Sequence, residues 1–451
     1  MTAWLPDRVW RGGQFESGVA LVADAEGRIV RFSREPSDLA QAERLAGCAI
    51  LPGLVNAHSH AFQRVIRGRT ERHTAAAGPD TFWTWRETMY HAANLLSPEA
   101  LYHAARMAFL EMLLGGITTV GEFHYLHHLP DGEPYPDRNA LAVQLLRAAG
   151  DTGLRIALLN VAYVRGGQPR FLTPRVEDFI AETEALATRC TPGRAWVGIA
   201  PHSVRAVALD DLLRLSEYAR GNSLPFHMHV AEQPAEVEGC LAEYGLRPVA
   251  LLDKHGILDQ RFTAIHAIHV TEDGIEQLGS ARSFVCACPT TERNLGDGIC
   301  PADRLNHTGV RIALGSDSNV QIDLLEDARE VEYHLRLERM ERVIFDRRNL
   351  AERLFACATE HGAASLSAPA GSLEPGRAAD FFTVDLNDPS IAGADSESLM
   401  SNIVFSLEQS AICDVFVGGQ RVIQDGHHLQ ESDILNNFGE VQRMLWMARR
   451  V

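Results

Sequence analysis

Lysine is almost missing from this chain of 451 residues, in which Lys254 is the only one. Nearly every cation is therefore an arginine guanidinium with a permanent charge. Acidic residues outnumber basic ones, and the formal net charge is -17 at pH 7. Such a charge repels phosphate backbones and anionic lipids, which argues against nucleic acids and membrane surfaces as partners. A small anionic ligand would need arginines placed close to it.

Long apolar runs and paired cysteines are missing as well. No uninterrupted stretch of about 18 apolar residues occurs, and residues 1–11 lack a basic segment followed by an apolar one. We therefore expect a soluble protein that is not exported. The eight cysteines form no CxxC pair and no repeated spacing, which predicts reduced thiols in the cytoplasm rather than disulfides or a thiolate zinc site.

Short runs rich in Val, Ile and Leu alternate with longer segments of helical period from about residue 50, which is typical of repeated βα units. The predicted strands are 51–57, 117–123, 155–164, 196–200, 225–230, 263–269, 283–288 and 311–315. The predicted helices include 98–114, 177–188, 210–220, 234–244 and a long one from 324 to about 364. Eight such units make a (β/α)8 barrel, whose chemistry lies at the carboxyl ends of the strands.

The two ends of the chain have a different pattern. Residues 1–48 and about 370–430 contain alternating strand-like runs with glycine turns, for example at Gly418 and Gly419. We expect a small β-sandwich domain built from both termini, followed by a closing helix over 433–450. The predicted division is 1–50 for the first part of this domain, 51–368 for the barrel and 369–451 for the remainder.

Histidines and an aspartate follow four of the predicted barrel strands. His58 and His60 come directly after the first strand, and alternation with period two places both rings on one side, where they can reach one metal ion. Alone, such a pair is more often structural. Further candidate ligands end strands five, six and eight at 227–229, 266–269 and 315–317. These residue types suit a borderline divalent cation, so the set favours a metal site.

We predict one zinc ion, held by His58, His60, His229 and Asp317. Three imidazoles and one carboxylate leave a position for water, as a catalytic zinc site requires. His227 shares a strand face with His229 and is the alternative ligand, although a hydrogen-bonded histidine inside the barrel explains it equally well. We expect His269 to support the site rather than to bind the ion.

Two groups are needed to move protons, because a water activated by zinc still requires a base and the departing group requires an acid. Glu232, three residues beyond His229, and His266 at the sixth strand are the candidates. We expect His266 or Asp317 to accept the proton of the water and Glu232 to protonate the leaving nitrogen. The alternative for Glu232 is a carboxylate that stabilises the start of a helix.

Several motifs together resemble the amidohydrolase superfamily, and in particular its deaminase branch with one metal ion. They cover nearly the whole chain and lie at 51–60, 116–119, 229–232, 266, 315–317 and 371–380. Binuclear members bridge their metals with a carboxylated lysine at strand four. Here residues 198–203 contain no lysine, and Lys254 lies in a helix-like segment before strand six. The resemblance therefore implies a single ion.

Within that branch, five segments are similar to the deiminases that act on a formimidoyl group carried by glutamate. These segments are 60–64, 82–90, 122–128, 201–207 and 288–298. The chain lacks the Asn-Pro-x-Ser-Asn segment that purine and pyrimidine deaminases of the branch carry after strand seven. The resemblance implies hydrolysis of N-formimidoyl-L-glutamate to N-formyl-L-glutamate and ammonia by a homodimer. The alternatives are a purine, pyrimidine or triazine substrate and, less favoured, a metal-free binding protein.

A substrate with two carboxylates calls for planar donors with permanent charge, which arginine supplies. Arg86 and Arg205 lie on predicted loops at the carboxyl ends of the strands. Gln63, Tyr125 and His202 are predicted to lie nearby as neutral donors. We expect these five side chains to bind the substrate.

Overall fold

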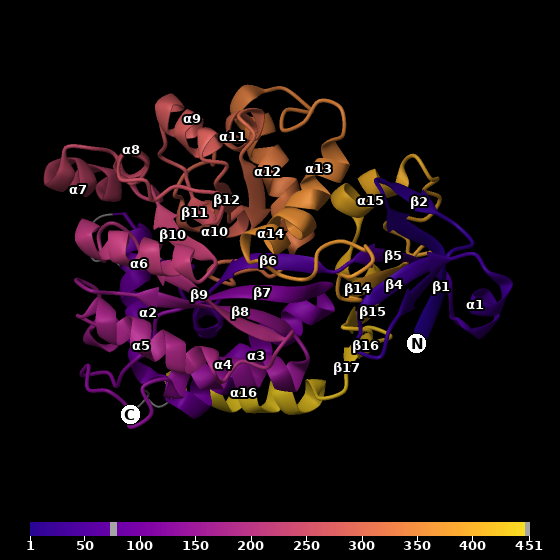
Figure 1. The fold of residues 1–451 in the computed structure, drawn as a ribbon, viewed down its shortest axis with the longest axis horizontal. Helices are drawn as coiled ribbons and strands as arrows, with labels where there is room; N and C mark the ends of the chain where they lie inside the picture. The colour runs from indigo at the N-terminus through magenta and orange to yellow at the C-terminus, as the bar shows by residue number, and fades with distance from the viewer. Residues whose placement is uncertain (73–78, 447–451) are drawn as a thin grey trace.

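A barrel of eight parallel strands forms the main body of the computed structural model, which describes residues 1–72 and 79–446 (Figure 1). In order around the barrel the strands are β6 (Leu54–Ser59), β7 (Ile117–His124), β8 (Arg155–Ala162), β9 (Ala195–Pro201), β10 (Phe226–Val230), β11 (Phe262–His266), β12 (Phe284–Ala287) and β13 (Arg311–Leu314). The barrel closes beyond β13, where Asp317 forms a parallel bridge with Ser59 of β6. The predicted fold class is confirmed.

Helices surround the strands and follow the predicted βα alternation (Figure 1). After the short segment η1 (Ala61–Ile66) come α2 (Phe82–Leu95), α3 (Pro98–Leu114), α4 (Ala140–Thr152), η2 (Pro169–Phe171), α5 (Val176–Ala187), α6 (Leu209–Gly221), α7 (Pro234–Tyr244), α8 (Pro248–Lys254), α9 (Glu272–Ser280), α10 (Pro289–Leu295), α11 (Ala302–His307) and α12 (Leu324–Arg339). Several begin with a proline in the first turn, where its missing N–H costs no hydrogen bond. Lys254 ends α8, away from β9, as the sequence predicts.

A second, mixed sheet is built from both ends of the chain, which lie side by side in Figure 1 as indigo and yellow strands. Its order is β17 (His427–His428), β16 (Gln420–Gln424), β15 (Ile412–Val417), β14 (Phe381–Asp385), β5 (Glu43–Pro52), β1 (Thr2–Arg11), β3 (Ala20–Ala23) and β4 (Ile29–Ser33), with β2 (Gln14–Glu16) beside β1. Trp4, Phe381 and Phe416 form its aromatic core. Helices α1 (Pro36–Gln41) and α15 (Leu399–Ser406) and the short η4 (Gln409–Ala411) complete this part.

The predicted strand 51–57 is in fact the junction of two strands. β5 ends at Pro52 in the mixed sheet and β6 begins at Leu54 in the barrel. Gly53 lies between them, and the side chain of Thr118 fills the space that a Cβ atom there would occupy. Because both strands are buried where they meet, the apolar run is continuous and hides the change of sheet.

The predicted helix from 324 to about 364 is interrupted. α12 ends at Arg339 because Met340 adopts a left-handed conformation with φ of 55°. The buried carboxylate of Glu332 then accepts hydrogen bonds from the backbone amides of Ile344 and Phe345, which holds the intervening loop. The chain resumes as α13 (Leu350–Ala356), a π-helical turn η3 (Cys357–His361) and α14 (Gly362–Ser365).

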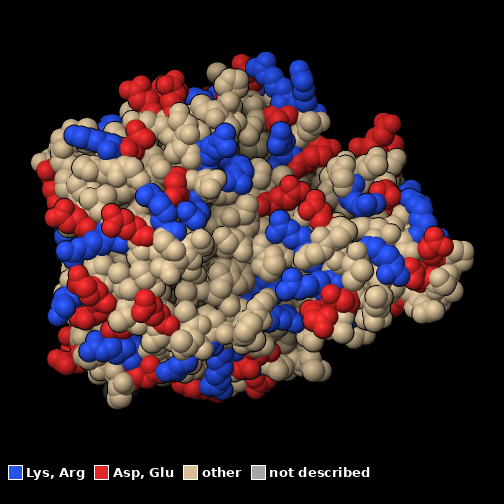
Figure 2. Space-filling view, in the orientation of Figure 1, with Lys and Arg blue, Asp and Glu red and all other residues tan. Residues whose placement is uncertain are grey.

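The closing helix predicted over 433–450 is α16 (Glu431–Trp446), and residues 447–450 lie outside the described part of the chain. Among the residues the structure describes, no helix combines the length and the apolar character needed to cross a membrane. Figure 2 shows acidic and basic side chains interspersed over one face, so that this face carries no continuous basic surface.

Candidate active site

Four potential metal ligands from distant parts of the sequence meet at the carboxyl end of the barrel. His58 is on β6, His60 follows it, His229 is on β10 and Asp317 follows β13. One donor atom from each residue lies within 4.8 Å of every other, and all four residues are buried. The Asp317 Oδ1 atom is 3.2 Å from His58 Nε2 and 3.3 Å from His60 Nε2. The structure therefore brings together the four residues that the sequence singles out.

Backbone carbonyls orient two of the three imidazoles. The Nδ1 atom of His60 lies 2.9 Å from the carbonyl oxygen of Phe123, and that of His229 lies 3.2 Å from the carbonyl oxygen of His202. An N–H donated to a carbonyl turns the other ring nitrogen, Nε2, toward the centre of the cluster. The rings of His60 and His229 therefore turn a lone pair toward the centre of the cluster.

The charges of these side chains suit a divalent cation. Burial lowers the pKa of His58 to about 3 and holds the pKa of His229 well below its usual range, so both rings are neutral. Burial alone would raise the pKa of Asp317, but its contacts with His58 and His60 bring that pKa well below the usual range. Neutral imidazoles with one ionised carboxylate match the donor set of a catalytic zinc site.

The aspartate at the centre is held by the backbone that closes the barrel. The amide of Asp317 donates to the carbonyl of His58 at 3.0 Å, and its own carbonyl accepts from the amide of His60 at 2.9 Å. Asp317 and His266 both have positive φ, at 44° and 71°. Non-glycine residues adopt this region at a cost, and such residues concentrate at functional sites.

Two acid–base groups lie beside the cluster. His266 ends β11, and its Nε2 atom is 3.8 Å from Glu232 Oε1 and 3.9 Å from Asp317 Oδ2. Burial raises the pKa of Glu232 to about 7. Burial lowers the pKa of His266, but the carboxylates of Glu232, Glu292 and Asp317 outweigh burial and hold that pKa well above its usual range. With a pKa near 7, Glu232 can therefore exchange a proton near neutral pH.

Glu292 was not singled out by the sequence, although it lies in the segment 288–298 that carries part of the resemblance. It is buried in α10, and its Oε1 atom lies 3.1 Å from His266 Nδ1. The same oxygen accepts a hydrogen bond from the amide of Cys288 at 2.9 Å. A carboxylate in the first turn of a helix has an ordinary structural explanation, so no sequence signal marks its contact with His266.

The cluster opens into a cavity that all five predicted substrate-binding residues line. Gln63 Nε2 donates to the Tyr125 hydroxyl at 3.0 Å. Besides these five and the groups described above, the lining contains Phe82, Trp85, Met89, Tyr90, Tyr163 and Leu295, which the sequence did not single out. Aromatic residues on helices and strands are ordinarily core residues, and only the fold shows that these face a cavity.

The two predicted arginines both line this cavity. Arg86 stacks against Trp83 and Tyr90, with its guanidinium carbon 4.4 Å and 5.2 Å from the ring centroids. Arg205 lies 4.0 Å from the buried carboxylate of Glu236. The Nε atoms of both arginines are buried without a hydrogen-bond partner among the described residues. They leave donors available to an anionic ligand.

The other two candidate histidines make separate contacts. His227 Nε2 lies 3.0 Å from the carbonyl oxygen of Ser365, and His269 Nε2 lies 3.0 Å from that of Asp297. Neither belongs to the group of four donors. These hydrogen bonds are those of histidines that support the barrel, His227 fully buried and His269 partly buried.

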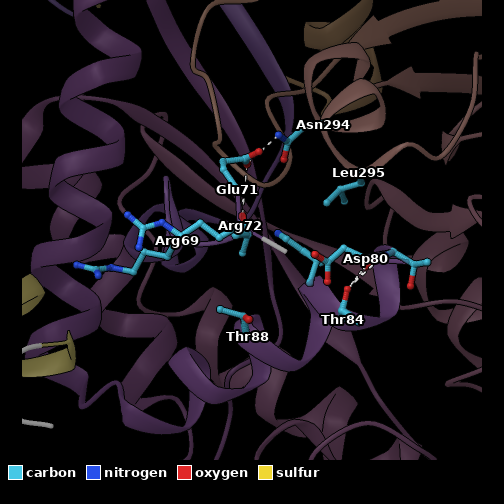
Figure 3. A pocket seen from close by; sticks show the side chains of 11 residues that line it. Arg69, Glu71, Arg72, Asp80, Thr84, Thr88, Asn294 and Leu295 are labelled. Carbon is cyan, nitrogen blue, oxygen red and sulfur yellow. Dashed lines mark hydrogen bonds between the residues drawn. The ribbon is translucent and has the colours of Figure 1, made fainter. Parts of the chain in front are cut away.

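An outer pocket adjoins the cavity and shares Trp85 and Leu295 with it. Figure 3 shows Thr84 and Thr88 of α2 on one side of this pocket and Glu71 turned toward Asn294 on another. The Asn294 amide donates to Glu71 at 3.0 Å. Arg69 and Arg72 also line the pocket together with Glu71 and Asp80, so its charged side chains are of both signs.

Comparison with known proteins agrees with this architecture. The model of the amidohydrolase family matches residues 49–422, and the chain belongs to this family. It is 37% identical to the formimidoylglutamate deiminase of Pseudomonas aeruginosa over 447 residues, which cover 94% of this chain and 97% of the relative. The predicted resemblance to that deiminase is therefore confirmed.

Solved structures give the same family and fold. An amidohydrolase from Brucella melitensis is 30% identical and superposes with a TM-score of 0.87 over 99% of this chain and 100% of its own. The atrazine chlorohydrolase of Arthrobacter aurescens, solved as a complex with zinc, is 22% identical with a TM-score of 0.87 over 98% of this chain and 100% of its own. At that identity the likeness concerns the fold alone.

Proposed function

We propose that this amidohydrolase is a formimidoylglutamate deiminase, which hydrolyses N-formimidoyl-L-glutamate to N-formyl-L-glutamate and ammonia. The observation that supports it most is the joint presence, in one cavity, of a zinc-type donor cluster, an acid–base pair and two arginines. The deiminase from Pseudomonas aeruginosa, similar over nearly the whole chain, supports the same substrate.

His58, His60, His229 and Asp317 would hold one zinc ion per subunit. When bound, zinc supplies a Lewis acid that lowers the pKa of a coordinated water to near 7. No lysine is available at β9 to bridge a second catalytic ion, because Lys254 ends α8. Catalysis therefore depends on one ion and on the carboxylate and imidazole groups around it.

The proton transfers follow from the positions of three side chains. Either Asp317 Oδ2 or His266 Nε2, which lie 3.9 Å apart, accepts the proton of the attacking water. Glu232, which burial brings to a pKa of about 7, is partly protonated at neutral pH and delivers its proton to the departing nitrogen. The C–N bond then breaks, ammonia leaves, and the carbon that bore the nitrogen keeps the oxygen of water as the formyl group.

Arg86 and Arg205 bind the two carboxylates of the glutamate moiety, and Gln63, Tyr125 and His202 complete the polar lining. Burial holds the pKa of His202 well below its usual range, so its ring is neutral. A planar purine or triazine has no carboxylate to pair with these guanidinium groups, which is the reason to prefer the dicarboxylate.

Ammonia release tests the proposal. Purified enzyme is assayed with formimidoylglutamate, an adenosine-type nucleoside, guanine, cytosine and an aminotriazine, before and after treatment with a chelator. We expect turnover of formimidoylglutamate alone, its loss on chelation and its recovery with added zinc. Release from a purine, pyrimidine or triazine instead would establish the alternative, and activity that survives complete metal removal would overturn the role of zinc.

We also propose a homodimer located in the cytoplasm. Size-exclusion chromatography with light scattering measures the molar mass, which for a dimer is twice the chain mass of 49.6 kDa. Cell fractionation tests the location.

A further inference from the structure

The two oxygens of Asp317 face two different sets of donors. Oδ1 lies beside His58 and His60, whereas Oδ2 lies 3.9 Å from the Nε2 atom of His266. His266, Cys288 and Asp317 form a second group whose donor atoms all lie within 4.8 Å of one another. All three residues are buried, and the thiol comes from the segment directly after β12. The proposed mechanism gives Cys288 no role.

His266 is oriented as a metal-ligating histidine usually is. Its Nδ1 atom faces the carboxylate of Glu292 at 3.1 Å, and the amide of Cys288 fixes the same carboxylate oxygen. An imidazole that donates Nδ1–H to a carboxylate exposes its lone pair at Nε2. That Nε2 atom is buried and has no hydrogen-bond partner among the described residues. A buried ring nitrogen without a partner needs an explanation, and a cation that takes the place of its proton supplies one.

The chemistry of the three donors selects the kind of cation. An imidazole nitrogen, a carboxylate oxygen and a thiolate sulfur together suit a borderline or soft divalent ion and not magnesium or calcium. Burial keeps the pKa of the Cys288 thiol well above its usual range, so an ion must displace the thiol proton when it binds. The carboxylates of Glu232 and Glu292 lie against His266 and supply further negative charge.

We propose that His266, Cys288 and Asp317 form a second, inhibitory cation site for zinc or cadmium, adjacent to the catalytic one. An ion there occupies His266 Nε2 and Asp317 Oδ2, and one of these two atoms accepts the proton of water in the proposed mechanism. Enzyme loaded with a second ion is therefore inactive. The scattered cysteine pattern does not reveal this site, because its thiol is joined with donors from two other strand ends.

Cadmium is the probe, since its thiolate complexes absorb in the ultraviolet. Enzyme that carries one zinc ion is titrated with cadmium at mildly alkaline pH, where a cation competes well with the proton for a ring nitrogen. Bound zinc and cadmium are counted by mass spectrometry, the thiolate absorption is recorded and ammonia release is assayed. We expect zinc to stay near one per chain, one cadmium to bind with thiolate absorption, and activity to fall in parallel.

Cys288→Ser tests the assignment, with Cys357→Ser as the matched control, because Cys357 is equally buried but lies in η3. We expect Cys288→Ser to keep activity with one zinc, to lose the thiolate absorption and to need at least about 10–100-fold more cadmium for inhibition, the scale on which lost supporting contacts weaken a metal site. Cys357→Ser should respond like the unaltered enzyme.

The site is refuted if the unaltered enzyme binds no second ion, or if Cys288→Ser and the unaltered enzyme show equal inhibition and absorption. Should Cys288→Ser fail to fold, anomalous diffraction from a cadmium-soaked crystal of the unaltered enzyme decides, since the ion must lie between the three side chains. Stoichiometry and absorption do not depend on the substrate. A failure of the proposed function would therefore leave this test intact.

Discussion

The buried charged groups at the two ends of the barrel differ in how completely they are hydrogen-bonded. At the amino-terminal end, Arg155 begins β8 and donates to both oxygens of Asp380, from Nε at 2.9 Å and from Nη2 at 2.8 Å. The amide of Gly418 adds a third hydrogen bond to this carboxylate, at 2.6 Å. Both charged side chains are buried. Both carboxylate oxygens of Asp380 therefore accept hydrogen bonds. The ion pair of Arg155 and Asp380 joins the barrel to the mixed sheet.

At the carboxyl end of the barrel, several buried polar atoms lack hydrogen-bond partners. His58 Nδ1, His266 Nε2 and Asp297 Oδ2 are buried without hydrogen-bond partners among the described residues. Asp317 and His266 also have strained backbone conformations. Proteins depart from complete satisfaction of polar groups chiefly where ligands or chemistry require it. We infer that the base of the barrel contributes stability, whereas the opposite end gives up stability for catalysis.

Glu232→Gln gives the largest expected effect on function and little effect on folding. Removing a general acid lowers turnover by about 10²–10⁴-fold. The change keeps the size and polarity of the side chain, so zinc content and the midpoint of thermal unfolding should stay close to those of the unaltered enzyme. Turnover near normal, with zinc bound, would remove Glu232 from the mechanism.

Asp380→Asn should instead lower the free energy of unfolding and leave activity unchanged. It leaves Arg155 as a buried cation without its counter-charge, which costs about 3–5 kcal/mol of unfolding free energy. Urea denaturation measures the loss, and activity per folded molecule should be unchanged. The control is Glu177→Gln in the exposed pair with Arg214, where the nitrogen–oxygen distance is 2.8 Å and the expected loss is about 0–1 kcal/mol. Equal losses in the two variants would contradict the division of roles between the two ends.

Arg205→Met tests whether this arginine recognises the substrate, and we expect a smaller effect than for the two preceding variants. The loss of a hydrogen bond to a charged group costs about 1.5–3 kcal/mol, which lowers kcat/KM for formimidoylglutamate roughly 10–100-fold. Use of a neutral formamidine should change much less, because that compound has no carboxylate to pair with the guanidinium. If kcat/KM falls equally for both compounds, Arg205 supports the structure of the cavity and does not recognise the substrate.

Much of this architecture follows from local patterns in the sequence. The alternation of apolar runs with helical segments specifies the barrel, and period two places His58 and His60 on one side of β6. Contacts between distant segments cannot be predicted from such local patterns. The contact of Glu292 with His266 depends on how α10 packs against β11, and the change of sheet at Gly53 leaves no break in the apolar run.

The break after α12 is equally hidden from local patterns. It depends on a left-handed Met340 and on the carboxylate of Glu332, which reaches amides twelve and thirteen residues further on. Neither residue type is a helix breaker. Periodicity therefore predicts the elements, whereas the ends of helices and the supports of the site depend on tertiary contacts.

The smallest expected effect concerns His127, a buried histidine at the catalytic end whose Nε2 atom lies 2.8 Å from the carbonyl oxygen of Val161. Burial lowers its pKa to about 4, below the value near 6.5 of an unfolded chain. As pH falls below 6.5, the unfolded state therefore takes up a proton that the folded state excludes, and stability falls by up to about 1.4 kcal/mol per pH unit.

His127→Gln can keep a donor for the Val161 carbonyl but removes the titration. Urea denaturation at pH 7.5 and 5.5 should show the unaltered protein losing about 1 kcal/mol more than the variant over this interval. Other buried histidines contribute to both proteins equally and cancel in the difference. An identical loss in the two proteins would mean that His127 takes up its proton as readily in the folded chain as in the unfolded one. The acid sensitivity of the catalytic end would then have to come from its unmatched groups.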